Sequence, residues 1–175
     1  VSGTPPMYEI VLSAATYTLT GAAGEDNNVT GDLDTKPWNW LYITGAGEAV
    51  TRINANHLDR VFDHWGPEWL ILTDLTIQNG QVATGMNGGG GIRSTNGADL
   101  WLIRTTVDSN TVNGLNGSQD IGGGIHNTAS TLNLESSTIS NNRAVAGGGL
   151  SLGNTNLWMD QTVVSGNVAA GSSGG

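Results

Sequence analysis

The sequence predicts an all-β fold and, within that class, a right-handed parallel β-helix of about five coils. A Gly triplet followed by an aliphatic residue occurs three times, at residues 89–92, 122–125 and 147–150. Each triplet is followed by two apolar residues, a β-branched residue and an Asn, which keep a fixed spacing among themselves. The 175-residue chain has 27 Gly and many Thr, Ser and Asn, which is typical of turn-rich β-structure. A repeat this short buries its apolar side chains only by stacking on its neighbours.

The same internal spacing relates all three repeats. In each, the first Leu lies seven residues before the β-branched residue and ten before the Asn. The repeats are Leu100-Trp101-Leu102 with Val107 and Asn110, Leu132-Asn133-Leu134 with Ile139 and Asn142, and Leu157-Trp158-Met159 with Val164 and Asn167. Equivalent positions of stacked coils lie about 4.8 Å apart. We therefore expect inward aliphatic ladders and an Asn ladder at a turn, where Asn tolerates the left-handed backbone conformation.

The distance between repeats indicates where the coils carry insertions. An earlier, degenerate copy ends at Ile77, and the β-branched positions from Ile77 onward are 30, 32 and 25 residues apart. The shortest spacing holds three short strands and their turns, so we place two long loop insertions at 78–88 and 111–121. A propeller blade would need about 40 residues. We predict one domain over residues 1–175, with irregular first coils over 1–60 and regular repeats over 61–175.

Short strands are also expected in the less regular N-terminal part. Local alternation and apolar residues indicate strands at 9–12, 16–20, 38–44, 52–53 and 60–62. Because successive side chains of a strand point to opposite faces, inward Leu41 and Ile43 would turn Trp40 and Tyr42 outward. The triplet Gly residues are expected to adopt positive φ and to let adjacent coils approach closely.

The order of these motifs resembles a known family. The motifs are Tyr17-Thr18-Leu19-Thr20, Gly31-Asp32-Leu33-Asp34, Ile43-Thr44-Gly45-Ala46-Gly47, Arg60-Val61-Phe62, Leu75-Thr76-Ile77 and the Gly triplets. They resemble bacterial right-handed parallel β-helix repeat proteins, including cell-surface proteins that begin with a Cys-Ser-Leu-Arg-Glu-Ala-Ile motif, and the similar polymorphic outer-membrane protein repeats. The resemblance implies a secreted or surface-exposed bacterial β-helix, often part of a longer chain. The Cys-bearing motif is missing here, and neither end shows an evident cap.

Charge and composition argue against several classes of partner. The formal net charge is −9, and six basic residues are scattered along the chain. Nucleic acid binding needs clustered Lys and Arg, so we expect no nucleic acid partner. No apolar run approaches the roughly 18 residues of a membrane helix. The chain has no Cys, so disulfides and thiolate metal sites are excluded.

Aromatic residues predict an interaction face. Trp101 and Trp158 occupy the outward position of equivalent strands, where Ile71 and Asn133 stand in the other copies. The residues expected on or near this face are Trp40, Tyr42, Trp69, Trp101 and Trp158. Large exposed apolar patches usually mark interaction sites. The face would bind a protein or a second subunit, or provide a platform for stacking sugars, unless one of the two long insertions folds over it.

The acidic segment around Asp26, Asp32 and Asp34 is a candidate calcium site, because Ca²⁺ takes 6–8 oxygen ligands. The segment matches no defined calcium loop, and Asp is also a common turn residue. We expect no other cofactor.

The sequence points away from an enzyme. Polysaccharide lyases and glycosidases with this coil place carboxylates together on one exposed sheet. Here Asp108, Glu135 and Asp160 are interpreted as non-equivalent positions beyond the core pairs, and the pair Asp63-His64 is interpreted as a surface contact. We expect a non-catalytic, extracellular or cell-surface structural or adhesive module. It would self-associate or bind other surface proteins through uncapped ends and the outward Trp face. The alternative is a carbohydrate-binding module or a lyase-like or glycosidase-like β-helix.

Overall fold

A computed structural model describes residues 6–22, 31–35, 39–83, 85–114, 119 and 121–171. Within these residues the chain forms nineteen β-strands and no helix, so the described part offers no helix that could cross a membrane. The strands belong to three sheets in which neighbouring strands run parallel. The predicted all-β class is therefore confirmed.

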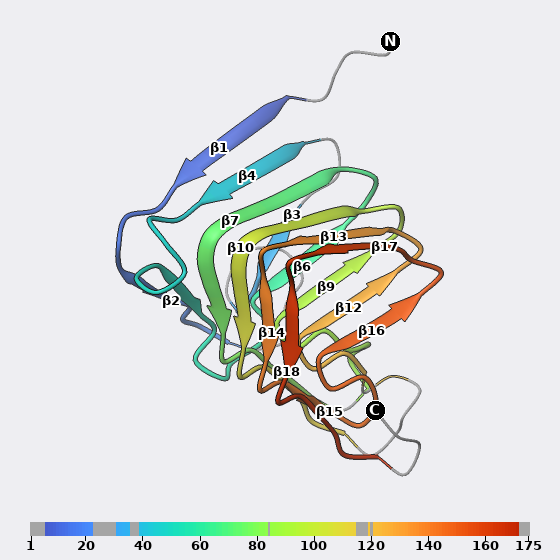
Figure 1. Ribbon diagram of the computed structural model, residues 1–175. Helices are drawn as coiled ribbons and strands as arrows, with labels where there is room; N and C mark the ends of the chain where they lie inside the picture. Colours follow the sequence, from blue (N-terminus) through green and yellow to red (C-terminus); the bar gives the residue numbers. More distant parts are fainter. Residues whose placement is uncertain are drawn as a thin grey trace.

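The largest sheet has ten strands (Figure 1). Its main order is β1 (Met7–Val11), β4 (Trp40–Thr44), β7 (Trp69–Gln78), β10 (Asp99–Asp108), β13 (Thr131–Glu135) and β17 (Asn156–Asp160). Beside this path lie β2 (Thr16–Thr18), β5 (Arg52–Asn54), β14 (Thr138–Ser140) and β18 (Val163–Ser165).

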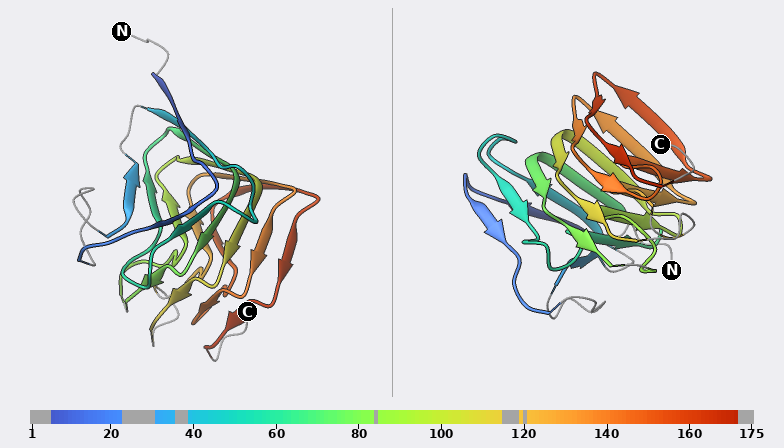
Figure 2. Two further views of the ribbon diagram at one scale, coloured as in Figure 1. Left: turned by 90° about the vertical axis from the view of Figure 1, so that its left-hand side faces the viewer. Right: turned by 90° about the horizontal axis from the view of Figure 1, so that it is seen from below.

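Two smaller sheets complete the structure. The five-stranded sheet has the order β16 (Leu150–Gly153), β12 (Ile125–Thr128), β9 (Ile92–Thr95), β6 (Phe62–Trp65) and β3 (Leu33–Thr35). The four-stranded sheet has the order β19 (Val168–Ala169), β15 (Arg143–Ala144), β11 (Thr111–Val112) and β8 (Gln81–Val82). From β6 onward the chain visits the five-stranded, the ten-stranded and the four-stranded sheet in turn. It then repeats this order, so that strands of successive passes lie side by side (Figure 2).

The core consists of apolar ladders that run across the sheets. The ladders pair Leu70, Leu100, Leu132 and Leu157 in one column and Leu72, Leu102, Leu134 and Met159 in the next. The first three members of each column are fully buried. Leu157 and Met159 are 42% and 40% exposed, because β17 is the last strand of the main path. The predicted inward ladders and their register are confirmed.

The two predicted insertions are not purely loop. The β-branched positions Ile77, Val107, Ile139 and Val164 pair in register as expected. However, the segments 78–88 and 111–121 contain β8 and β11 of the four-stranded sheet. Val82 and Val112 of these strands are buried in a small apolar cluster of their own with Ala144. These two-residue strands were missed because each contains a single apolar residue, and one residue shows no alternation.

The Asn ladder occupies a buried corner where the ten-stranded sheet meets the four-stranded one. The side chains of Asn110, Asn142 and Asn167 form a continuous chain, with Nδ2 donating to the next Oδ1 at 3.0 Å in both steps. Each Oδ1 also accepts a backbone N–H of the preceding pass at 2.8–2.9 Å. The expected left-handed conformation is wrong for these residues. It falls one position earlier, at Ser109, Asn141 and Gly166, because the ladder Asn must point inward.

Positive φ and close backbone approach, the two properties expected of the Gly triplets, occur at different positions of each triplet. The first Gly of each triplet, Gly89, Gly122 and Gly147, has a φ of 70°, 65° and 57°, respectively. The second and third Gly lie against the backbone of the next pass, and Gly91 N–H donates to the carbonyl oxygen of Gly123 at 3.2 Å. A side chain has no room at these later positions.

Gly90→Ala is expected to lower the free energy of unfolding by about 1–3 kcal/mol. Its Cβ would lie 2.5 Å from the carbonyl oxygen of Gly123 and 2.8 Å from that of Thr111, and neither backbone atom can rotate away. Gly153→Ala is the matched control, because its Cβ would meet the side chain of Thr128 at 3.2 Å. Urea unfolding compares the three proteins. Equal losses in both variants would contradict the close approach as the cause.

Candidate functional site

The predicted aromatic residues lie on the outward face of the ten-stranded sheet. Trp101 pairs in register with Ile71 on one side and with Asn133 on the other, and Asn133 pairs with Trp158. Tyr42 pairs with Ile71 and extends the same column. Because the residues on either side of these positions point into the core, this column faces outward.

Three tryptophans of this face are in contact with each other. The rings of Trp40 and Trp69 stack at a centroid distance of 4.7 Å and an interplanar angle of 8°. Trp101 follows at 6.4 Å from Trp69, tilted by 38°. The stacked pair uses one ring face of each indole for contact within the chain. Trp158 is 48% exposed at the edge strand β17.

The charge of this face is mainly negative. The strand positions 7–11, 40–44, 69–73, 99–103, 131–135 and 156–160 contain no Lys or Arg. Arg104, the next residue of β10, pairs with Asp74 and its charge also acts on Glu135. Outward carboxylates stand among these strand positions at Glu9, Asp99, Glu135 and Asp160. Glu135 and Asp160 pair in register, so their interpretation as non-equivalent positions is wrong. We name the outward side of these six strands the aromatic–acidic face.

The two long insertions do not cover the aromatic–acidic face in their described parts. Val82 and Val112 belong to the four-stranded sheet and pack together, with Met86 against them. The backbone carbonyls of Met86 and Gly88 accept hydrogen bonds from Arg60, which ties that segment to the five-stranded sheet. The alternative of a buried aromatic cluster therefore has no support in the described residues.

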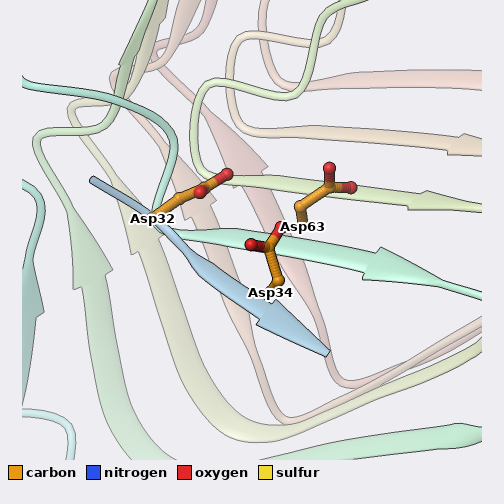
Figure 3. Close-up of side chains that lie close together, drawn as sticks. All are labelled: Asp32, Asp34 and Asp63. Atoms are coloured by element: carbon orange, nitrogen blue, oxygen red, sulfur yellow. The ribbon is translucent and has the colours of Figure 1, made fainter. Parts of the chain in front are cut away.

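The acidic candidate site is built differently from its prediction. Carboxylate oxygens of Asp32, Asp34 and Asp63 lie within 4.8 Å of one another (Figure 3). Asp34 and Asp63 are register partners on β3 and β6, and Asp32 directly precedes β3. Asp63 was not predicted as a member. Asp26 lies outside the described residues.

A buried arginine neutralises part of this cluster. The Arg60 guanidinium Nε lies 3.3 Å from Asp32 and 3.9 Å from Asp59. Its Nη1 and Nη2 donate to the carbonyl oxygens of Gly88 and Met86 at 3.1 and 3.2 Å. Arg60 is among the largest fully buried side chains of the described residues. A buried guanidinium charge is tolerated only where several carboxylates and carbonyl oxygens compensate it.

The remaining carboxylates keep an excess of negative charge. Arg93 makes a two-pronged pair with Asp63, with Nε donating to Oδ1 at 2.8 Å. Burial raises the pKa of Asp32 to about 7, and the negative charges of Asp59 and Asp34 add to this effect. Oδ1 of Asp32 is buried without a hydrogen-bond partner. The guanidinium groups of Arg60 and Arg93 already provide positive charge here, and calcium binding at this cluster stays a prediction.

His64 is a core residue rather than a surface partner of Asp63. It is 2% exposed, and adjacent strand positions send its ring inward while Asp63 points outward. Burial lowers the pKa of His64 to about 4, so the ring is neutral at pH 7. Its Nε2 lies 3.1 Å from the carbonyl oxygen of Glu68 and its Nδ1 lies 2.6 Å from Oγ1 of Thr35. A carbonyl only accepts, so Nε2 carries the proton and Nδ1 accepts from Thr35.

A second group of side chains was not predicted as a site. Trp65, Arg93 and His126 line a hollow on the outward side of the five-stranded sheet. His126 and Arg93 are register partners, and each is the second residue after its Gly triplet. Trp65 was missed. Continuing the strand alternation from inward Phe62 by three residues would have placed it outward.

Comparison of the chain with protein-family models, with curated proteins and with solved structures finds no match.

Proposed function

We propose that the three sheets are the faces of one right-handed parallel β-helix of the kind that the motif resemblance implies. The fixed order of visits to the three sheets supports this proposal, because parallel neighbours within each sheet then come from successive turns of the chain. The in-register apolar and Asn ladders support it further. Right-handed crossover is the rule for parallel strands.

We propose that this coil is a non-catalytic interaction module and that the aromatic–acidic face is its docking surface. The observation that carries the proposal is the row of Trp40, Trp69 and Trp101 on the outward side of a sheet, where solvated positions are ordinarily polar. Aromatic side chains are enriched at the centres of protein interfaces. The partner is a protein whose surface combines apolar side chains with Lys or Arg.

Charge and ring geometry select this partner over two others. A second copy would bring the same four carboxylates and a formal charge of −9 against this face, and like charges across an interface are costly. A sugar platform needs free ring faces, and the stacking of Trp40 on Trp69 occupies one face of each of these rings. A basic and apolar protein surface satisfies both the aromatic row and the carboxylates.

The edge strands support a structural role within a larger assembly. On β1, Tyr8 and Ile10 pair with Leu41 and Ile43 of the inward columns, and the same columns end on β17. A further coil, either from the same polypeptide or from another molecule, would continue both columns and pair the exposed strand edges. We place the module outside the cell, as the resemblance implies.

A displayed library of random peptides tests the docking surface. Phage selected on the purified chain are compared for binding to the Trp69→Ala/Trp101→Ala variant and to Trp65→Ala, which changes a tryptophan on the five-stranded sheet. We expect selected peptides that contain both apolar residues and Lys or Arg. Their binding should weaken about tenfold or more in the double variant, since Trp residues dominate interface energetics, and stay unchanged in Trp65→Ala.

Thermal unfolding of each variant controls for loss of the fold. Asp99→Asn provides a second readout, because it removes one carboxylate of the face beside Trp69. The binding of basic peptides should weaken by a smaller factor and become less dependent on salt. Peptides that bind the double variant as well as the parent would refute the proposal.

A further inference from the structure

The outward side of the five-stranded sheet carries a hollow of about 400 Å³. This volume lies in the range of small-molecule pockets. Among the side chains that line this hollow are Trp65, Arg93, Thr95, Asn96, His126 and Thr128. Trp65 is 51% exposed, so its ring is accessible from the solvent.

Strand register arranges these groups in two outward columns. Trp65 on β6 pairs with Thr95 on β9, and Thr95 pairs with Thr128 on β12. Two residues earlier along the same strands, and therefore on the same face, Arg93 pairs with His126. Neighbouring strands are about 4.8 Å apart, so one aromatic ring and two hydroxyl groups stand in a row along a floor about 10 Å long.

The hollow is polar but offers little net charge. The Arg93 guanidinium is held by Asp63 in a two-pronged pair. Burial lowers the pKa of His126, and the charges of Arg93 and Arg60 lower it further, so this ring is neutral at pH 7. Its Nε2 lies 3.1 Å from Oγ1 of Thr128. An anionic ligand would find no uncompensated cation among these groups and would approach a chain with a formal charge of −9.

Hydroxyl and amide groups both donate and accept hydrogen bonds, as the hydroxyl groups of a sugar do. The C–H side of a pyranose ring is apolar and carries a small positive potential, which matches the negative face of an indole ring. We propose that this hollow binds a neutral pyranose unit of a glycan, with Trp65 packing on the sugar ring and Thr95, Asn96 and Thr128 bonding to its hydroxyl groups.

This site is separate from the aromatic–acidic face. It lies on another sheet and uses none of the same residues, so a glycan and a protein partner are bound independently.

Titration with defined oligosaccharides tests the inference. The probes are neutral cello-, xylo-, manno- and chito-oligosaccharides, with oligogalacturonate as the anionic comparison. Binding is followed by calorimetry and by the indole N–H signals of the six Trp in a ¹⁵N-labelled chain. We expect saturable binding of at least one neutral probe and a shift of the Trp65 signal.

Matched variants assign the site. Trp65→Ala should weaken binding about tenfold or more, since an aromatic contact and its buried area are lost. Trp158→Ala removes an equally exposed tryptophan on the other sheet and should leave the affinity unchanged. Thr95→Val keeps the side-chain shape and removes the hydroxyl group, which should weaken binding about threefold.

Three results would overturn the inference: no saturable binding of any neutral probe, undiminished binding by Trp65→Ala in a folded chain, or a preference for oligogalacturonate. The peptide selection on the aromatic–acidic face is unaffected by each of these results, so the two proposals fail separately.

Discussion

Asn142→Ala is expected to lower the free energy of unfolding by about 3–5 kcal/mol, because the side chain is the central rung of a buried ladder. Its Oδ1 accepts from the backbone N–H and from the Nδ2 of Asn110, at 2.9 and 3.0 Å. Its Nδ2 donates to the carbonyl oxygen of Val107 and to Asn167. Asn142 is fully buried, so water does not reach these groups without a change of structure.

Urea unfolding measures this loss, with Asn156→Ala as the matched control. Asn156 is an exposed residue of the edge strand β17, and its truncation should change stability by less than about 0.5 kcal/mol. A loss of below about 1 kcal/mol in Asn142→Ala would show that water replaces the amide and that the ladder is not a main source of stability.

Asp32→Asn is expected to stabilise the chain at neutral and alkaline pH. The pKa of Asp32 is raised from 3.8 to about 7 by burial and by the nearby carboxylates. The folded state therefore binds more protons than the unfolded state between pH 4 and 7. The contribution of Asp32 to the free energy of unfolding therefore falls as the pH rises through this interval and stays constant above it. A pKa difference of this size corresponds to roughly 4 kcal/mol, and the gain is smaller because the amide also loses the ion pair with Arg60.

The experiment compares urea unfolding at pH 5 and pH 8. The advantage of Asp32→Asn over the parent should be larger at pH 8. Asp160→Asn removes one exposed carboxylate from β17 and controls for the change in net charge. If Asp32→Asn were instead less stable than the parent at pH 8, the ionised carboxylate would be a required partner of Arg60, and the excess of negative charge in the cluster would be disproved.

The positions that the sequence predicted best are those set by repetition. The seven-residue interval from Leu100 to Val107 recurs in the next repeats, and the structure pairs all of these residues in register. Apolar residues at equal spacing must share one core, and stacking then fixes which residue lies beside which. The outward direction of Trp101 and Trp158 follows from the same alternation.

Positions decided by backbone conformation were harder to predict. The left-handed residues are Ser109 and Asn141, each directly before the Asn of the ladder. Two polar turn residues in succession give no local reason to choose between them. The second residue of each pair, Asn110 or Asn142, makes the hydrogen bonds inside the corner, and the first residue therefore takes the left-handed conformation. The one local signal for this position was Gly166 before Asn167, because Gly adopts positive φ readily.

The sequence by itself determined the all-β class, the repeat and the apolar ladders, because each depends on residue type at a regular interval. Only the tertiary structure decided which polar groups meet. It brought Asp63 to Asp34 across 29 residues and placed Trp65 beside Thr95. It also enclosed Arg60 among Asp32, Asp59 and two carbonyl oxygens. Charges and hydroxyl groups recur at no regular interval in the sequence, so their neighbours are fixed by the pairing of parallel strands around a shared core.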